Sequence, residues 1–236
     1  MIVVGIETST PQTSVAIGSE QGIVAQMSVA GRARQEAAAP ALQQLLRWSG
    51  TDLAKVGGVA VGVGPGLFTG LRVGVETAKT LAQVLGVPIV GLTSLDVLAV
   101  AVRHSPGRIC AVIDGHRGEV FWSLYEPVPG GVVRETEHAV DTPDRLIAEL
   151  LAVPGDVLLV GDGAILYRHE IERELGGRVG FASATHAHPQ AAQLVELAAP
   201  RFLREEHDRL FDVVPVYLRK SDAEIAWDQR ARGAST

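Results

Sequence analysis

The sequence has few of the features that mark secreted, membrane-spanning or disordered proteins. Cys110 is its single cysteine, so an internal disulfide is impossible and a reducing compartment is favoured. Glycine or a charged residue interrupts every apolar stretch well before the roughly 20 residues that a membrane helix needs. The first residues, MIVVGIETST, have neither the basic region nor the cleavage site of a signal peptide. We therefore expect a cytoplasmic protein without a membrane segment.

Clusters of basic residues are also scarce, which bears on the binding of nucleic acid. The formal net charge is −6, and only the GRAR segment at 31–34 and the stretch near 230–232 are locally basic. A protein that binds nucleic acid alone usually carries a basic patch that neutralises phosphates. Direct binding by the isolated chain is therefore disfavoured, whereas a supporting role beside a more basic subunit is not.

Aromatic residues are few, at 5% of the chain, whereas alanine, valine, leucine and glycine abound. Small and branched aliphatic side chains of this kind are typical of parallel or mixed sheets that are covered by helices. With 236 residues, the chain is long enough for one large domain or two compact ones.

The first half of the sequence has an ordered series of strand and helix patterns. Apolar runs separated by turns predict a β-meander at 2–6, 14–18 and 23–29. Buried strands are predicted at 59–63 and 88–92. The helical spacing of apolar residues predicts helices over 36–48, 68–85 and 94–102. Ser94 is the predicted N-cap of the third helix.

A similar order begins again after the turn at 105–107. Strands are predicted at 109–114, 119–125, 132–140, 157–161, 179–181 and 213–217. Helices are predicted from 141 to about 151, over 164–175 and over 189–203. Pro200 should kink the last of these helices or end it early.

This repetition predicts a duplicated ribonuclease-H-like architecture. Its units are residues 1–104 and 105–219, and a polar tail follows at 220–236. An ordinary doubly wound sheet is the alternative, but such sheets normally begin strand-helix-strand, and the initial meander argues against it.

The most informative stretch is GPGLFTGLRVG at 64–74, which joins a buried strand to a long helix. Its glycines permit a tight turn and leave N–H groups open at the helix N-terminus, which attracts anions. It is neither a P-loop nor a dinucleotide fingerprint, because the required residues are absent. Close packing of the helix against the strand is the other interpretation, and physical considerations alone favour it.

Three further motifs accompany this stretch: MIVVGIETSTPQTSVAI at 1–17, VIDGHRGEVF at 112–121 and PVYLR at 215–219. The four motifs resemble, in the same order, segments of the TsaB family, which is also called YeaZ. That family carries GPGSFTGLRIG, a similar opening strand-turn-strand, IDARxGEVY and a closing PxYLR. The resemblance spans most of the chain. It implies an α/β protein with the actin-like ATPase (ASKHA) fold, built of two ribonuclease-H-like lobes with mixed sheets.

The resemblance also implies a function and partners. TsaB acts as a non-catalytic subunit beside its paralogue TsaD and the ATPase TsaE. Together they form threonylcarbamoyladenosine at the adenosine next to the anticodon of tRNAs that read codons starting with A. We therefore expect a heterodimer with a TsaD-like protein, self-association as a homodimer, and contact with tRNA only through the complex. No cofactor of its own is expected, and ATP or ADP at the partner interface stays open.

The metal ligands of the catalytic paralogues have no counterpart in this sequence. Those paralogues use a His-x-x-x-His pair on the helix after the last strand of the first lobe, because one helical turn places both imidazoles on the same side. Ser94 and Leu98 stand at the corresponding positions. His186 and His188 form another cluster, for which a loop or capping role is favoured because no third ligand lies nearby. We expect no metal site.

Catalytic residues are not predicted either. The chain has no Gly-x-Ser-x-Gly elbow, and Cys110 lies within a strand pattern without a nearby base.

Contact with a nucleotide or anion is predicted for residues near the first strand of each half. Glu7 ends the first strand, where actin-like ATPases commonly place an aspartate and the TsaB family usually has one. The predicted contacts are Glu7, Thr8, Thr10, Gly66, Thr69, Asp114 and Arg117. Local capping of a hairpin turn by the hydroxyls is the favoured alternative, and Arg117 can simply pair with Glu119. A stand-alone ATPase or small-molecule kinase is the alternative function.

The helices at 36–48 and 68–85 carry more apolar surface than one sheet face can bury, and their small alanines permit close helix approach. In the TsaB family these helices pack against TsaD or against a second TsaB. The predicted partner-binding residues are Arg34, Ala38, Ala41, Leu42, Leu45, Leu46, Arg72, Val73 and Thr77. A role in the core is the alternative for the three leucines.

Overall fold

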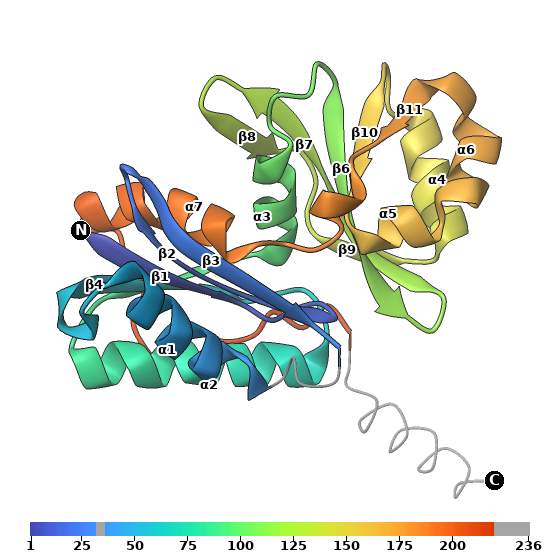
Figure 1. Cartoon of the computed structure of the whole chain (residues 1–236). Helices are drawn as coiled ribbons and strands as arrows, with labels where there is room; N and C mark the ends of the chain where they lie inside the picture. Colours follow the sequence, from blue (N-terminus) through green and yellow to red (C-terminus); the bar gives the residue numbers. More distant parts are fainter. Residues whose placement is uncertain (32–35, 220–236) are drawn as a thin grey trace, which may run out of the picture.

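The computed structural model describes residues 1–31 and 36–219, which form two lobes (Figure 1). The first lobe is built on a five-stranded sheet in the order β3-β2-β1-β4-β5. Central strand β1 pairs antiparallel with β2 and parallel with β4, which makes the sheet mixed. The strands are β1 (Ile2–Glu7), β2 (Gln12–Ser19), β3 (Gly22–Ala30), β4 (Val56–Gly62) and β5 (Ile89–Leu92).

The second lobe repeats this arrangement. Its sheet has the order β11-β10-β6-β7-β8, and β9 also pairs with β7. Strand β6 is antiparallel to β7 and parallel to β10, as β1 is to β2 and β4. The strands are β6 (Arg108–His116), β7 (Glu119–Val128), β8 (Gly131–Arg134), β9 (Ala139–Asp141), β10 (Val157–Val160) and β11 (Val179–Phe181). The predicted duplication is therefore confirmed.

Helices cover both faces of both sheets (Figure 1). The outer face of the first sheet carries α1 (Ala38–Ser49) and α2 (Phe68–Leu85). Two helices, α3 (Ser94–Ala101) and α7 (Ala191–Leu203), lie between the sheets. The outer face of the second sheet carries α4 (Pro143–Ala152), α5 (Asp162–Leu166) and α6 (Arg168–Leu175). Single 3-10 turns occur at η2 (Leu53–Lys55), η3 (Gly176–Arg178) and η4 (Ala184–His186).

This layering explains the apolar character of the central elements. Val4 of β1 packs in the core beneath α1 and α2, while its neighbour Val3 packs against α7. A strand buried on both faces needs an almost continuous apolar run. Helix α3 has apolar residues on both of its buried sides for the same reason, because Val97 faces α7 whereas Leu95 and Leu98 face the second sheet.

Residues at the helix ends mostly behave as their chemistry predicts. Helix α2 ends at Gly86, which has the left-handed conformation (φ 65°) that glycine adopts easily. At the start of α4, the Thr142 side chain accepts a hydrogen bond from Arg145 N–H. The prediction that Ser94 caps α3 is wrong. Thr93 is the cap and accepts from Asp96 N–H, because the Ser94 hydroxyl donates to Glu7 instead.

Two predicted elements of the second lobe are divided. The strand expected at 132–140 is β8 and β9, because Thr136 between them interrupts the ladder. Its hydroxyl accepts a hydrogen bond from Leu124 N–H, and its carbonyl accepts one from the Ser123 hydroxyl. The helix expected at 164–175 is α5 and α6, which are separated at Tyr167.

The predictions for the last part of the chain also need correction. Helix α7 continues through Pro200 to Leu203. Pro200 lacks only the N–H that would bond to the carbonyl of Glu196, and both residues are exposed, so water can satisfy that carbonyl. The strand expected at 213–217 does not form. Val216 N–H donates to the Val63 carbonyl at 2.7 Å, and the bridge to the edge of the sheet is made earlier, between Asp208 and Ile89.

An element that follows the proposed boundary at residue 104 packs against the sheet that precedes it. Helix α7 follows the second sheet in sequence, yet it packs against β1 and β2 of the first. The boundary itself stays a prediction, and the tail at 220–236 lies outside the described residues. Among the helices of the described ranges, none is both long and apolar enough to cross a membrane.

Candidate functional site

Glu7 lies at the carboxyl end of β1 and is completely buried. One carboxylate oxygen accepts a hydrogen bond from Ser9 N–H at 2.7 Å, and the other accepts one from the Ser94 hydroxyl at 3.1 Å. Burial raises the pKa of Glu7, and these hydrogen bonds oppose the rise. Gly62 makes room for the side chain, because a Cβ there would lie 2.0 Å from a Glu7 oxygen. The carboxyl group is thus an enclosed hydrogen-bond acceptor.

The glycine-rich loop before α2 packs directly on the turn that follows Glu7. Thr8 donates its hydroxyl hydrogen to the Gly70 carbonyl at 2.8 Å, and Leu67 N–H donates to the Ser9 carbonyl at 2.7 Å. A Cβ on Gly66 or Gly70 would come within 2.2 Å of a carbonyl oxygen in this turn. These contacts support the close-packing interpretation of the loop, and its role as an anion site stays a prediction.

The other two threonines predicted to contact a nucleotide differ in their exposure. Thr10 is 2% exposed, and its hydroxyl has no hydrogen-bond partner among the described residues. Thr69 is exposed on the first turn of α2.

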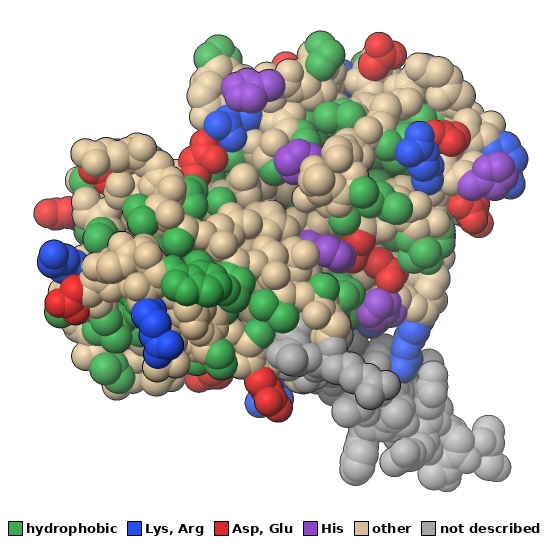
Figure 2. Space-filling view, in the orientation of Figure 1, with side chains coloured by type: hydrophobic (Ala, Val, Ile, Leu, Met, Phe, Trp, Pro, Cys, Tyr) green, Lys and Arg blue, Asp and Glu red, His purple; other side chains and the backbone are tan. Residues whose placement is uncertain are grey.

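Asp114 belongs to a cluster of acidic and histidine side chains in the second lobe. Its carboxylate lies 2.8 Å from His116 Nδ1, and its backbone N–H donates to the Asp162 carboxylate at 3.0 Å. His188 Nδ1 lies 3.6 Å from the other Asp162 oxygen. Burial raises the pKa of Asp162 to about 6 and lowers the pKa of His188. Figure 2 shows histidine and acidic side chains together where the lobes meet.

The predicted nucleotide contacts therefore form two groups. Glu7 and Thr8 bond to neighbours in the first lobe and α3, whereas Asp114 bonds to neighbours in the second lobe. Arg117 lies in the tight β6–β7 hairpin with a φ of 57°. Sequence reasoning missed Asp162, for which the only signal was a Gly-Asp-Gly turn after a predicted strand. Nucleotide contact by either group stays a prediction.

Ser94 and Leu98, which we expected at the positions of the paralogues' metal ligands, are both buried in the interior. Ser94 is fully buried beside Glu7, and Leu98 is fully buried against the second sheet. Neither side chain can reach a cation in solvent, and leucine has no ligand atom. Within residues 1–31 and 36–219, no group of three or more histidine, cysteine or acidic residues is arranged to hold a metal.

A groove of about 780 Å³ runs between α1 and α2 on the outer face of the first lobe. Hydrophobic side chains gather over this part of the lobe in Figure 2. The most exposed large hydrophobic residue of the lining is Val84, at 77%. The groove is lined by Ala39, Pro40, Leu42, Gln43, Leu46, Leu53, Glu76, Thr77, Thr80, Leu81 and Val84.

The predicted partner-binding residues are divided between this groove and the core beneath it. Leu42, Leu46 and Thr77 line the groove. Ala38, Ala41 and Leu45 are at most 4% exposed and belong to the core of the lobe. Their side chains therefore support α1 from below, and their contact with a partner stays a prediction.

The remaining partner-binding predictions lie on α2 or outside the described residues. Arg72 is exposed, with its guanidinium 5.6 Å from the centre of the Phe68 ring, and Val73 is half-buried. Arg34 is not among the described residues. Sequence reasoning missed Leu81 and Val84, although their spacing from Thr77 already placed all three on one side of a helix.

Curated relatives match nearly the whole chain. The TsaB protein of Bacillus subtilis, named for tRNA threonylcarbamoyladenosine biosynthesis, is 31% identical over 96% of this chain and 98% of its own length. The TsaB protein of Escherichia coli is 28% identical, with coverage of 96% and 97%. A tRNA N6-adenosine threonylcarbamoyltransferase of Geotalea uraniireducens is 33% identical but matches only 49% of this chain and 40% of its own.

Solved structures and a family model agree with these relatives. YeaZ from Pseudomonas aeruginosa superposes with a TM-score of 0.78 at 30% identity, over 92% of this chain and 99% of that one. Component A of (R)-2-hydroxyglutaryl-CoA dehydratase from Acidaminococcus fermentans, at 11% identity and a TM-score of 0.51 over 85% and 98% of the chains, shares the actin-like fold alone. The family model described as TsaD, tRNA N6-adenosine threonylcarbamoyltransferase, matches residues 9–227. Since full-length similarity is to TsaB proteins, this chain belongs to the TsaB (YeaZ) family.

Proposed function

We propose that this chain acts in the biosynthesis of threonylcarbamoyladenosine on tRNA, as a non-catalytic subunit that binds a TsaD-like transferase through the α1–α2 groove. The names of its TsaB relatives support the reaction. The observation that carries the role is the apolar groove itself, because a broad apolar surface on a soluble protein marks an interaction site. A TsaE-like ATPase completes the cytoplasmic complex, whose target is the adenosine next to the anticodon of tRNAs that read codons starting with A.

The burial of Glu7 and Ser94 supports the non-catalytic part of the proposal. A transferase that relies on a metal needs ligands that are open to the substrate. Here the Glu7 carboxyl is enclosed by Ser9 and Ser94, and Leu98 is in the core. The partner therefore has to supply the cation and the transfer chemistry.

The same geometry weighs against the alternative of a stand-alone ATPase or small-molecule kinase. Such an enzyme needs a carboxylate that is exposed to Mg-ATP, and Glu7 is not exposed. We propose that the isolated chain holds no nucleotide and that ATP or ADP is bound only at the partner interface. Calorimetry with Mg-ATP on the isolated chain, and then on the complex, separates the two cases.

The groove assignment is tested by placing a charge in it. Val84 lines the groove and is 77% exposed, so Val84→Asp leaves the core intact. A carboxylate buried in an apolar interface without a partner is costly, so we expect at least a tenfold weaker Kd for the TsaD homologue of the same organism, about 1.4 kcal/mol or more. Isothermal titration calorimetry measures this Kd.

The matched control is Val133→Asp, which introduces the same charge at a valine of β8 that is 53% exposed in the second lobe. We expect this variant to bind as the native chain does. An unchanged Kd for a folded Val84→Asp variant would show that the partner binds elsewhere. A loss of tRNA modification in the reconstituted complex should accompany the loss of binding.

A further inference from the structure

The last residues that the structure describes, 213–219, form a strap where the two lobes meet (Figure 1). They include PVYLR at 215–219, a motif that the proposed function leaves without a role. The strap forms neither a strand nor a helix, so its course depends on the contacts that its backbone and side chains make. These contacts begin on the first lobe and end on the second.

Three contacts hold the first part of the strap on the first lobe. Val213 is 3% exposed and belongs to the core cluster beneath α1 and α2. Val216 N–H donates to the carbonyl of Val63, which directly follows β4, at 2.7 Å. The Tyr217 ring stacks on the Phe68 ring at the start of α2, with ring centres 4.9 Å apart. The strap is therefore attached on both sides of the glycine-rich loop.

The last two residues of the strap contact the second lobe. Leu218 is half-buried and packs against the apolar cluster of α3 and the second sheet, which includes Ile113 and Phe121. The Arg219 guanidinium donates to the carboxylate of Glu119, at the start of β7, at 2.6 Å. Glu119 directly follows the tight β6–β7 turn, so this end of the strap is attached beside that hairpin.

The strap is one of a small number of connections between the lobes. The other two in the described chain run from β5 to β6 and from β11 to α7. Lobes that are joined in this way commonly change their relative angle by hinge motion. Tyr217 contacts the first lobe and the next residue, Leu218, contacts the second, and consecutive Cα atoms are about 3.8 Å apart. The strap therefore cannot lengthen between its two attachments.

The two ends of the strap differ in the strength of their attachment. Removal of Val213 from the core would expose its apolar surface to water. The Arg219 and Glu119 side chains are 23% and 36% exposed, and an ion pair so open to solvent stabilises a contact only weakly. The strap therefore detaches more easily from the second lobe than from the first, and such a local opening needs no global unfolding.

We propose that the strap is a clasp that holds the two lobes at one angle, and that release of Leu218 and Arg219 lets the second lobe rotate away from the glycine-rich loop. The same rotation moves the group around Asp114 relative to the group around Glu7, because the two groups bond within different lobes. The clasp thus fixes the geometry of the junction between the lobes.

The clasp does not depend on the groove that we assign to the transferase. None of residues 213–219 lines the α1–α2 groove. We expect Val84→Asp to leave the angle between the lobes unchanged, and a variant that opens the clasp to leave the groove itself intact. The failure of one proposal is therefore distinguishable from the failure of the other.

A charge exchange between Glu119 and Arg219 tests the clasp. Arg219→Glu and Glu119→Arg each place like charges together, whereas the double variant restores an opposite pair. Spin labels on Arg47→Cys of α1 and Ala148→Cys of α4, both exposed, report the distance between the lobes by pulsed electron paramagnetic resonance. Cys110 does not interfere, because it is buried and burial raises its pKa.

We expect each single variant to add a longer distance, with the ratio of the longer to the native population raised at least about twofold. The double variant should return to the native distribution, which also shows that the substituted chains are folded and isolates the pair from other contacts of either residue. The matched control is Arg173→Glu, which makes the same charge change beside Glu174 within α6 and should leave the distances unchanged.

A second variant, Leu218→Ser, tests the apolar part of the same attachment. It removes the packing of Leu218 against the second lobe without a change of charge, and we expect it to lengthen the distance as the single charge variants do. A native distance distribution in Arg219→Glu, Glu119→Arg and Leu218→Ser would overturn the proposal. So would a double charge variant that stays as open as the single ones.

Discussion

Three carboxyl groups show how the fold sets the charge of individual residues. Burial raises the pKa of both Glu7 and Asp162, the latter to about 6. Burial alone would also raise the pKa of Asp96, but the nearby His138, Thr93 and Tyr125 side chains lower it below its ordinary value. The direction of the shift thus depends on whether enough donors accompany the carboxyl group into the interior.

Asp162 makes stability depend on pH in a predictable direction. Its ordinary pKa of 3.8 rises to about 6 in the folded chain, so the folded state holds the proton more tightly. The stabilising contribution is full below about pH 4 and is lost as the pH rises through 6. The difference corresponds to at most about 3 kcal/mol. Asp162→Asn should remove this loss, because the amide oxygen can still accept from Asp114 N–H and carries no charge.

Urea unfolding of the native chain and of Asp162→Asn between pH 4 and pH 7 measures the effect. We expect the free energy of unfolding of the variant to rise relative to that of the native chain across this interval. His188, whose pKa is lowered by burial, and the neighbouring Asp114 and His116 are present in both proteins, so their contributions largely cancel in the difference. Parallel pH profiles would show that Asp162 has an ordinary pKa.

Sequence reasoning identified the residue types of these sites but not their surroundings. Glu7 was recognised as the end of a strand, yet its burial depends on Ser94, which lies 87 residues away, and on the absence of a Cβ at Gly62. The glycine spacing of the 64–74 loop could be read as an anion site or as close packing. Only the contacts with Thr8 and Ser9 distinguish these interpretations, and local sequence does not contain them.

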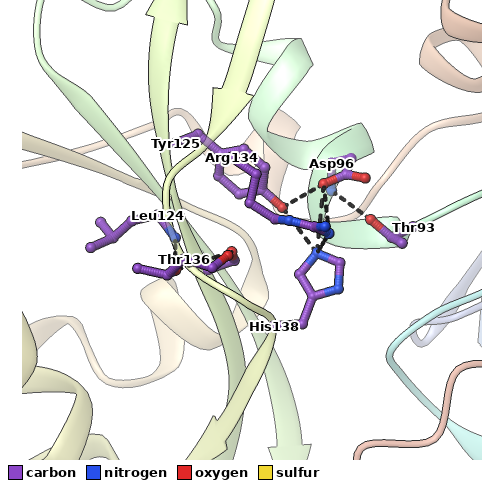
Figure 3. A network of polar contacts seen from close by, with 8 residues as sticks. Thr93, Asp96, Leu124, Tyr125, Arg134, Thr136 and His138 are labelled. Atoms are coloured by element: carbon purple, nitrogen blue, oxygen red, sulfur yellow. Dashed lines mark hydrogen bonds and ion pairs between the residues drawn. The ribbon is translucent and has the colours of Figure 1, made fainter.

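At the scale of elements, α3 is the helix that joins the two sheets. Its apolar side chains pack against the cores of both sheets, and its one acidic residue, Asp96, points into a polar network (Figure 3). The Tyr125 hydroxyl of β7 donates to Asp96 at 2.8 Å, and His138 Nε2 lies 3.6 Å from the same carboxylate. Arg134 of β8 in turn donates to His138 at 2.8 Å. The network therefore fixes α3 to three segments of the second lobe.

Removal of one hydroxyl from this network should weaken the fold measurably. Tyr125 is 1% exposed, so Tyr125→Phe keeps the packing of the ring and deletes the hydroxyl, which donates to Asp96 at 2.8 Å and lies 3.4 Å from His138 Nε2. The carboxylate then loses a donor while it remains largely buried, and we expect the free energy of unfolding to fall by about 1–3 kcal/mol. Chemical denaturation followed by circular dichroism measures this change.

Tyr167→Phe is the matched control for this substitution. Its hydroxyl forms no hydrogen bond with another described residue, so we expect a change within about 0.5 kcal/mol. Equal losses in both variants would mean that the hydroxyl of Tyr125 contributes through general packing and not through Asp96.

Helices and strands with strong periodicity were predicted well, and the predictions failed where side chains from distant segments intervene. The bounds of α2 agree with prediction at both ends, because Gly86 ends the helix and the apolar stripe is regular. Leu45 and Leu46 of α1 could not be assigned to core or surface, since this depends on where α2 lies. The strand expected at 132–140 is divided into β8 and β9 because the Thr136 hydroxyl accepts a hydrogen bond from Leu124 N–H. The spacing of apolar residues does not predict this bond.

At the scale of the whole molecule, the two lobes complete each other's cores. Helix α7 comes after the second sheet in sequence but fills one face of the first sheet, where Leu194, Val195 and Phe202 pack beside Val3 and Val90. Helix α3 comes before the second sheet and covers one of its faces. The repeated order of elements could be read from the sequence, but this exchange of helices could not, because apolar periodicity does not say which sheet a helix covers.

The exchange predicts that neither half of the chain folds stably alone. A fragment of residues 1–104 lacks α7 and exposes the apolar cluster of Val3, Ala16, Ala60 and Val90, so the hydrophobic gain is too small to offset the loss of chain entropy. A fragment of residues 105–219 lacks α3 and exposes the opposing sheet face. We expect each fragment to give a poorly dispersed NMR spectrum, and an equimolar mixture to recover native-like dispersion. A cooperative unfolding transition in the isolated 1–104 fragment would instead show that the first sheet is stable without α7, and that the boundary at residue 104 separates two independent domains.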